Sequence, residues 1–138
     1  AMDFPAKQPV AEAVPPGLLQ ALGLAEARAL YRTDDYLVVI DDEALIDGLK
    51  PDFAALAAFD VRGVAVTAPP RVGVNEDPVT GSAHTSLAPY WAQRLGKTVL
   101  SAEQGGARKG QLRCEVRDNG RVIISGQAAL YLRGAIFL

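Results

Sequence analysis

The hydrophobic residues of this chain fall into short apolar runs in its first half and one long helical pattern in its second half. Residues 36–40 and 63–68 are continuous apolar stretches rich in β-branched residues, and they predict two buried strands. Short helical segments are predicted around these strands, at 16–23, 41–49 and 51–59. The first of these should end at a glycine, and the last should carry a proline in its first turn.

The most regular pattern runs from Ala83 to Leu95, where apolar residues recur at helical spacing. The apolar stripe is broad and contains Trp91, so we expect this helix to be wrapped by sheet. Pro89 lies too deep for a first-turn proline, and it predicts a kink.

The remaining segments are extended or β-rich. Residues 7–16 hold three prolines and predict an extended segment. The sequence Asp118-Asn119-Gly120 predicts a hairpin with a type I′ turn. Strands are expected at 98–103, 112–116, 121–125 and 128–138. Together these patterns predict a single α+β domain over residues 1–138, with a curved antiparallel or mixed sheet, or a barrel, around one helix.

Composition and charge narrow the class of protein. The chain has 138 residues, of which 49% are hydrophobic and 22% charged, and this length can bury a core without disulfides or metals. A net charge of −2 gives no electrostatic reason to expect nucleic acid or an anionic membrane as a partner. No apolar run approaches the roughly 20 residues of a membrane helix. The single cysteine favours a reducing compartment, so we predict a cytoplasmic protein.

The chemistry-bearing residues gather in the loop 76–84, directly ahead of the long helix. A helix N-terminus offers unpaired N–H groups and a positive dipole end, which suit an anion. Thr80, Gly81 and Ser82 could form such an anion cradle, or Thr80 or Ser82 could be a plain N-cap that stabilises the helix by about 1 kcal/mol. Asp77 could hold an amine or hydroxyl of a substrate, or it could simply initiate a turn.

His84 is the one histidine, and it falls in the first helical turn, where the dipole disfavours its charged form. A structural or orienting role is favoured over catalysis there. We expect Glu76 to be a solvated or paired carboxylate. Arg108 and Lys109 could touch a carboxylate, although a solvated loop is the commoner outcome. Cys114 lies in a predicted strand with alternating apolar residues, so we expect it in the core. One histidine and one cysteine provide no metal-ligand spacing, so no metal is predicted.

Several blocks of the sequence resemble the phenazine-biosynthesis PhzF-like family. The resemblance rests on five segments in family order: Met2–Ala6, Glu76–His84, Pro89–Trp91, the glycine-rich stretch Gln104–Gly110, and Ile124–Ala128. It implies a diaminopimelate-epimerase-like fold and, specifically, that family's second, C-terminal domain. It also implies a cofactor-independent isomerase that moves a proton on a small carboxylate substrate, with Asp77, Thr80, Gly81, Ser82 and His84 as substrate-binding residues.

The sequence departs from that family in two respects. The proton-carrying glutamate of the family's first domain has no counterpart here, so no catalytic residue is assigned to this chain. The connection 69–74 is also shorter than is usual in the family. Three hypotheses follow: one half of an isomerase completed by a further domain, a self-associating non-catalytic small-molecule-binding domain, and a fragment without activity of its own. A homodimer is expected under the second.

Overall fold

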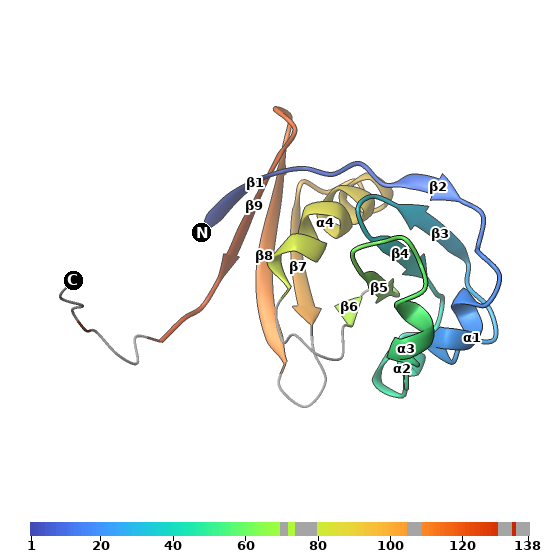
Figure 1. The fold of residues 1–138 in the computed structure, drawn as a ribbon. Helices are drawn as coiled ribbons and strands as arrows, with labels where there is room; N and C mark the ends of the chain where they lie inside the picture. Colours follow the sequence, from blue (N-terminus) through green and yellow to red (C-terminus); the bar gives the residue numbers. More distant parts are fainter. Residues whose placement is uncertain (70–71, 74–79, 105–108, 130–133, 135–138) are drawn as a thin grey trace, which may run out of the picture.

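The structure is a computed structural model that describes residues 1–69, 72–73, 80–104, 109–129 and 134, and two β-sheets flank one long helix in it (Figure 1). The four-stranded sheet is antiparallel throughout and has the strand order β1-β9-β8-β7. Its strands are β1 (Met2–Pro5), β7 (Val99–Gln104), β8 (Gly110–Arg117) and β9 (Arg121–Gly126).

The five-stranded sheet is mixed and has the order β2-β3-β4-β5-β6. Only β4 and β5 run parallel, and the crossover between them carries the short helices α2 (Ala44–Asp47) and α3 (Phe53–Leu56). Helix α1 (Leu18–Leu22) precedes β3. The strands are β2 (Val10–Glu12), β3 (Ala29–Arg32), β4 (Tyr36–Val39), β5 (Val64–Thr67) and β6 (Val72–Gly73).

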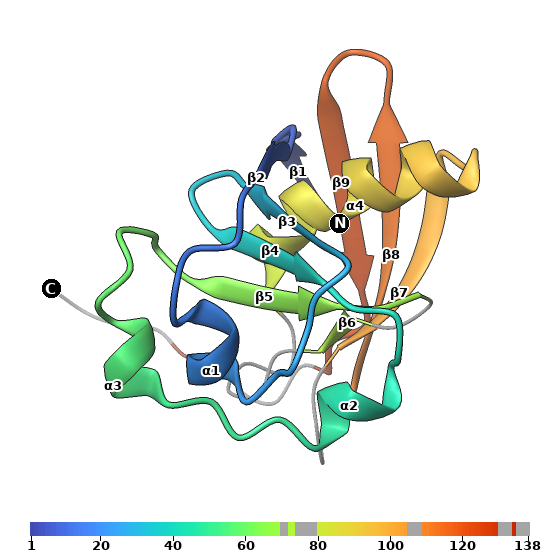
Figure 2. The same ribbon diagram turned by 90° about the vertical axis from the view of Figure 1, so that its right-hand side faces the viewer.

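The hydrophobic core has separate clusters on the two faces of β4, because this strand is buried on both faces. Alternate residues of a strand point to opposite sides. Val38 accordingly packs in the cluster that contains Leu18 and Leu22 of α1, while Leu37 and Val39 pack against the long helix α4 (Gly81–Leu95). A third cluster joins α4 to the four-stranded sheet through Ala88, Leu112, Cys114, Val122 and Ile124. Helix α4 therefore lies between the two sheets (Figure 2).

Burial along α4 confirms the prediction of a helix wrapped by sheet. Residues 83–90 are all buried, whereas Leu95 at the end of the helix is exposed. Pro89 lies inside this helix and has no N–H to donate to the carbonyl of Thr85. The backbone N–H of Lys7 donates to that carbonyl instead, at 2.9 Å. The N-terminal segment is thus attached to α4 at the carbonyl that Pro89 leaves without its usual helical partner.

Three local expectations are corrected by the structure. No hydrogen-bonded ladder joins the two sheets within the described ranges, so those strands form two open sheets and not a barrel. The hairpin after β8 is confirmed, but its loop has three residues between Arg117 and Arg121. Gly120 alone adopts positive φ there, which excludes a type I′ turn. Pro51 precedes α3, whose N-cap is Asp52, so it is not a first-turn proline.

Several other predicted elements are confirmed, and some observed strands had no prediction. The helices expected at 16–23 and 41–49 and the strands at 36–40 and 63–68 are present. Strands β1, β3 and β6 were not predicted as strands. The strand expected at 128–138 lies largely outside the described residues, and Ala128 and Ala129 are not in a strand. Across the described ranges, no helix combines the length and the apolar character that crossing a bilayer requires.

Candidate functional site

The start of α4 is held by a glutamine from the four-stranded sheet. Gln104 closes β7 and is fully buried. Its Nε2 donates to Thr80 Oγ1 at 2.8 Å, and its Oε1 accepts from the Thr80 backbone N–H at 3.0 Å. These two bonds tie the N-cap residue of the helix to the sheet, so the position of the helix start is fixed by tertiary structure.

Within the described residues, the first turn of α4 has no capping side chain. The Thr80 hydroxyl is engaged by Gln104 and makes no cap bond to the helix. A Cβ placed on Gly81 would meet no other described group within 4 Å, and Ser82 is exposed. The N–H groups of this turn and the positive end of a 15-residue helix form a region suited to an anion.

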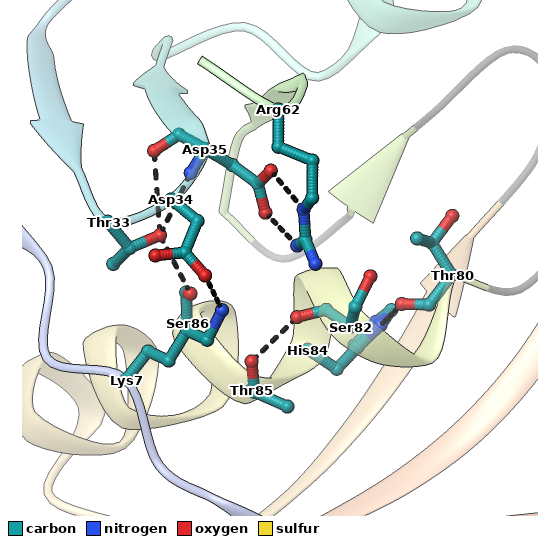
Figure 3. Close-up of polar contacts among 10 residues, drawn as sticks. All are labelled: Lys7, Thr33, Asp34, Asp35, Arg62, Thr80, Ser82, His84, Thr85 and Ser86. Carbon is teal, nitrogen blue, oxygen red and sulfur yellow. Dashed lines mark hydrogen bonds and ion pairs between the residues drawn. The ribbon is translucent and has the colours of Figure 1, made fainter.

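His84 lies in the first turn of α4, and its ring points toward Thr80 (Figure 3). Its side chain is 1% exposed, and its Nδ1 is 2.9 Å from the Thr80 carbonyl oxygen. A carbonyl only accepts, so Nδ1 carries the proton and Nε2 is an acceptor. Burial lowers the pKa of His84 below its ordinary value, and the bond to Thr80 opposes this in part. The neutral ring therefore orients the first turn, and its direct contact with a substrate stays a prediction.

A charged cluster that the sequence analysis did not anticipate surrounds the turn between β3 and β4 (Figure 3). Lys7 pairs with Asp34, and this hydrogen bond lowers the pKa of Asp34. Arg62 binds Asp35 through two parallel bonds, at 2.9 and 2.5 Å. Since each carboxylate is held by a cation, the cluster is a set of ion pairs that fixes the turn. Adjacent aspartates in a short connection were its only signal in the sequence.

The same turn contacts the long helix. Thr33 Oγ1 lies 3.2 Å from Ser86 Oγ, and Ser86 is buried on α4. On the neighbouring strand β5, Thr67 Oγ1 accepts from Trp91 Nε1 at 3.1 Å. These polar contacts fix α4 relative to the five-stranded sheet, as Gln104 does relative to the other sheet.

Several predicted residues are not placed by the structure. Asp77, Glu76 and Arg108 lie outside the described residues. Lys109 is described, and its Nζ pairs with Glu103 Oε1 at 3.0 Å, so its charge is already matched. Cys114 is buried in the core, as predicted, and burial raises the pKa of its thiol to about 11. Within the described part of the chain, no group of three or more His, Cys, Asp or Glu residues could hold a metal ion.

Sequence comparison identifies the family. The profile described as "Phenazine biosynthesis-like protein" (PhzC-PhzF) matches residues 20–134. The chain belongs to the PhzF-like family. An uncharacterised isomerase of Pseudomonas aeruginosa is 65% identical over the whole chain, which covers 57% of that protein. The alignment runs over 150 positions against 138 residues, so that relative contains residues that this chain lacks.

Solved structures of the PhzF-like family agree with this assignment. A PhzF-family protein of Enterococcus faecalis matches with a TM-score of 0.84 and 40% identity, and a putative PhzC/PhzF protein of Clostridium difficile matches with a TM-score of 0.86 and 32% identity. Each alignment covers 99% of this chain and 57% of the other. These matches confirm the predicted family and the α+β fold class. The chain spans less than two thirds of the length of these relatives.

Proposed function

We propose that this chain is part of a PhzF-like isomerase or epimerase that acts on a small carboxylate substrate by acid–base proton transfer without a cofactor. The single observation that carries the proposal is the first turn of α4, which has no capping side chain among the described residues and which Gln104 holds in place, in a family whose curated relatives include an uncharacterised isomerase. The N–H groups of Gly81 and Ser82 and the Ser82 hydroxyl would receive the substrate carboxylate.

Proton transfer requires a base beside the bound substrate. His84 is a poor candidate because it is buried and its Nδ1 is bonded to Thr80. The curated relatives are longer than this chain, and we propose that the base comes from a further domain or from a second copy of the chain. Asp77 remains the proposed contact to an amine or hydroxyl of the substrate.

The carboxylate contact is tested by removing one backbone donor. Gly81→Pro deletes an N–H at the first helical position, where proline is tolerated, and the extended backbone of Thr80 is compatible with a following proline. The matched control is Gly81→Ala, which keeps the N–H and has room for its methyl group. The probe is hydroxyanthranilate, a cyclic amino-hydroxy carboxylate, and binding is followed by NMR through the Ser82 amide.

We expect Gly81→Pro to weaken binding roughly tenfold or more, as the loss of a charge-assisted hydrogen bond should, and Gly81→Ala to leave it unchanged. The methyl ester of the probe should bind far more weakly than the acid. Equal binding of acid and ester, or an unaffected Gly81→Pro variant, would contradict the carboxylate site. A thermal shift that is the same in wild type and Asp77→Ala would contradict the role of Asp77.

Light scattering on the 14.6 kDa chain tests whether the proposed base comes from a second copy or from a further domain. A particle of twice that mass would support the second copy, and with it the alternative of a self-associating binding domain. A monomer that gains isomerase activity only when the remaining part of a relative is added would support the further domain.

A further inference from the structure

The hairpin between β8 and β9 carries an asparagine–glycine pair at its exposed tip. Its loop holds Asp118, Asn119 and Gly120 between the paired Arg117 and Arg121, and all three loop residues are exposed. The tip projects beyond the rest of the four-stranded sheet (Figure 1). Within the described residues, the Asn119 side-chain amide has no hydrogen-bond partner. This amide is therefore accessible to water and to the backbone that follows it.

The residue after Asn119 favours attack on that amide. The backbone nitrogen that follows an asparagine can attack the side-chain Cγ, because the ring that closes has five members. A side chain on the following residue hinders this attack, and Gly120 has none. The Gly120 N–H donates to the Arg117 carbonyl at 3.2 Å, in a turn where Asn119 has negative φ. This bond is at the long end of the normal range and lies in an exposed loop, so a small local opening releases the nitrogen.

We propose that Asn119 deamidates in the folded protein, which makes the hairpin tip a site of spontaneous modification. The Gly120 nitrogen loses its proton and bonds to Asn119 Cγ, the bond from Cγ to the amide nitrogen breaks, and ammonia leaves with the proton. Water then opens the succinimide ring at either carbonyl. One product has aspartate at position 119, and the other has isoaspartate, whose main chain runs through the β-carbon. The reaction consumes water, releases ammonia and does not rest on the proposed isomerase function.

Isoaspartate at position 119 changes how the N-terminal segment is held. It lengthens the backbone by one atom directly before Gly120, whose carbonyl accepts from the Ala6 N–H at 2.8 Å. Because the paired strands on either side fix the ends of the loop, the extra atom must displace this carbonyl. The neighbouring bond from Lys7 ends on Thr85 of α4 and is remote from the tip. Modification should therefore weaken the Ala6 bond and spare the Lys7 bond.

The reaction is tested by incubating the folded chain at mildly alkaline pH, where more of the attacking nitrogen is deprotonated. Peptide mapping by mass spectrometry and an isoaspartate-specific methyltransferase assay identify the products. We expect both products at position 119, formed several-fold faster than any product at Asn75, which glutamate follows in the sequence. Asn119→Ser removes the reacting amide and keeps a residue suited to a turn, so the isoaspartate at this position should disappear.

A comparison with the urea-unfolded chain tests whether the folded state itself reacts. Its rate should be lower than that of the unfolded chain by no more than roughly tenfold, which is the effect of opening one exposed hydrogen bond. Hydrogen exchange of the chromatographically separated isoaspartate form should be faster at the Ala6 amide and unchanged at Lys7. The matched control is Asn119→Asp, which adds the same charge without the extra backbone atom and should keep Ala6 protected.

Three results would overturn the proposal. The first is an intact Asn119 in the folded chain after a time that converts the unfolded chain completely. The second is reaction at Asn119 that is no faster than at Asn75. The third is Ala6 exchange that is the same in the isoaspartate form and in Asn119→Asp, which would remove the proposed effect on the N-terminal segment.

Discussion

At the scale of single residues, burial moves His84 and Cys114 toward their neutral forms. Burial lowers the pKa of the imidazole and raises that of the thiol to about 11. The alternating pattern around Cys114 predicted its place in the core. The helical pattern placed His84 in the first helical turn but could not predict its burial, which depends on how the sheets pack over that turn.

We predict that titration of His84 destabilises the fold in mild acid. The unfolded chain takes up a proton near the ordinary histidine pKa of 6.5, whereas the folded chain takes it up only at lower pH. The unfolded state therefore binds more protons below pH 6.5. The free energy of unfolding should fall as the pH drops through 6.5 toward the lower pKa of the folded state, and this component should be absent above about pH 7.

The measurement is an NMR titration of the imidazole, which is unambiguous because the chain has one histidine. A folded-state midpoint at or above 6.5 would refute the prediction. Urea unfolding of wild type and His84→Gln at several pH values supplies the energetic comparison, because only the wild type should show this pH-dependent component.

At the scale of elements, strong local patterns predicted the structure well and weak ones did not. The apolar run of β4 and the helical stripe of α4 can be recognised in the sequence because elements buried on both faces need hydrophobic residues. Strand β1 is short and contains Asp3 and Pro5, and it is a strand because it pairs with β9 from the other end of the chain. Strand β3 is likewise set by pairing with β2 and β4.

The start of α4 gives a prediction at this scale. Replacing Gln104 by leucine leaves the Thr80 N–H and hydroxyl without their described partner. We expect a loss of about 1–3 kcal/mol in the free energy of unfolding, since partly buried polar groups lose their hydrogen bonds. Binding of the carboxylate probe should also weaken, because the helix start is no longer held.

The matched control is Gln111→Leu, the same change at an exposed glutamine of the same sheet, which should stay within about 0.5 kcal/mol of wild type. Denaturant unfolding measures both variants. Equal stability of the two leucine variants would show that Gln104 does not hold the helix.

At the scale of the whole molecule, the N-terminal segment links both sheets to the helix between them. Strand β1 belongs to the four-stranded sheet and β2 to the five-stranded sheet. In the connection, the Ala6 N–H donates to the Gly120 carbonyl at 2.8 Å and the Lys7 N–H to the Thr85 carbonyl at 2.9 Å. The Lys7 side chain pairs with Asp34 on the far turn.

We predict from these bonds that the Lys7 amide exchanges slowly with solvent although it lies outside any strand. Hydrogen exchange followed by NMR should show protection at Ala6 and Lys7 comparable to that in β9. The internal control is Gln8, whose N–H has no backbone acceptor among the described residues. Exchange of Lys7 as fast as that of Gln8 would mean that the segment is not attached to the helix.

The sequence by itself determined the class of fold, the buried strand β4, the long helix and the family, because each is encoded in contiguous residues whose hydrophobic spacing or motif can be read locally. Only the tertiary structure decided that the strands form two sheets around α4, that Gln104 holds Thr80, and that His84 is buried in the first turn of the helix. The physical reason is that these features depend on contacts between residues far apart in the chain, and hydrophobic periodicity says which residues are buried but not against what.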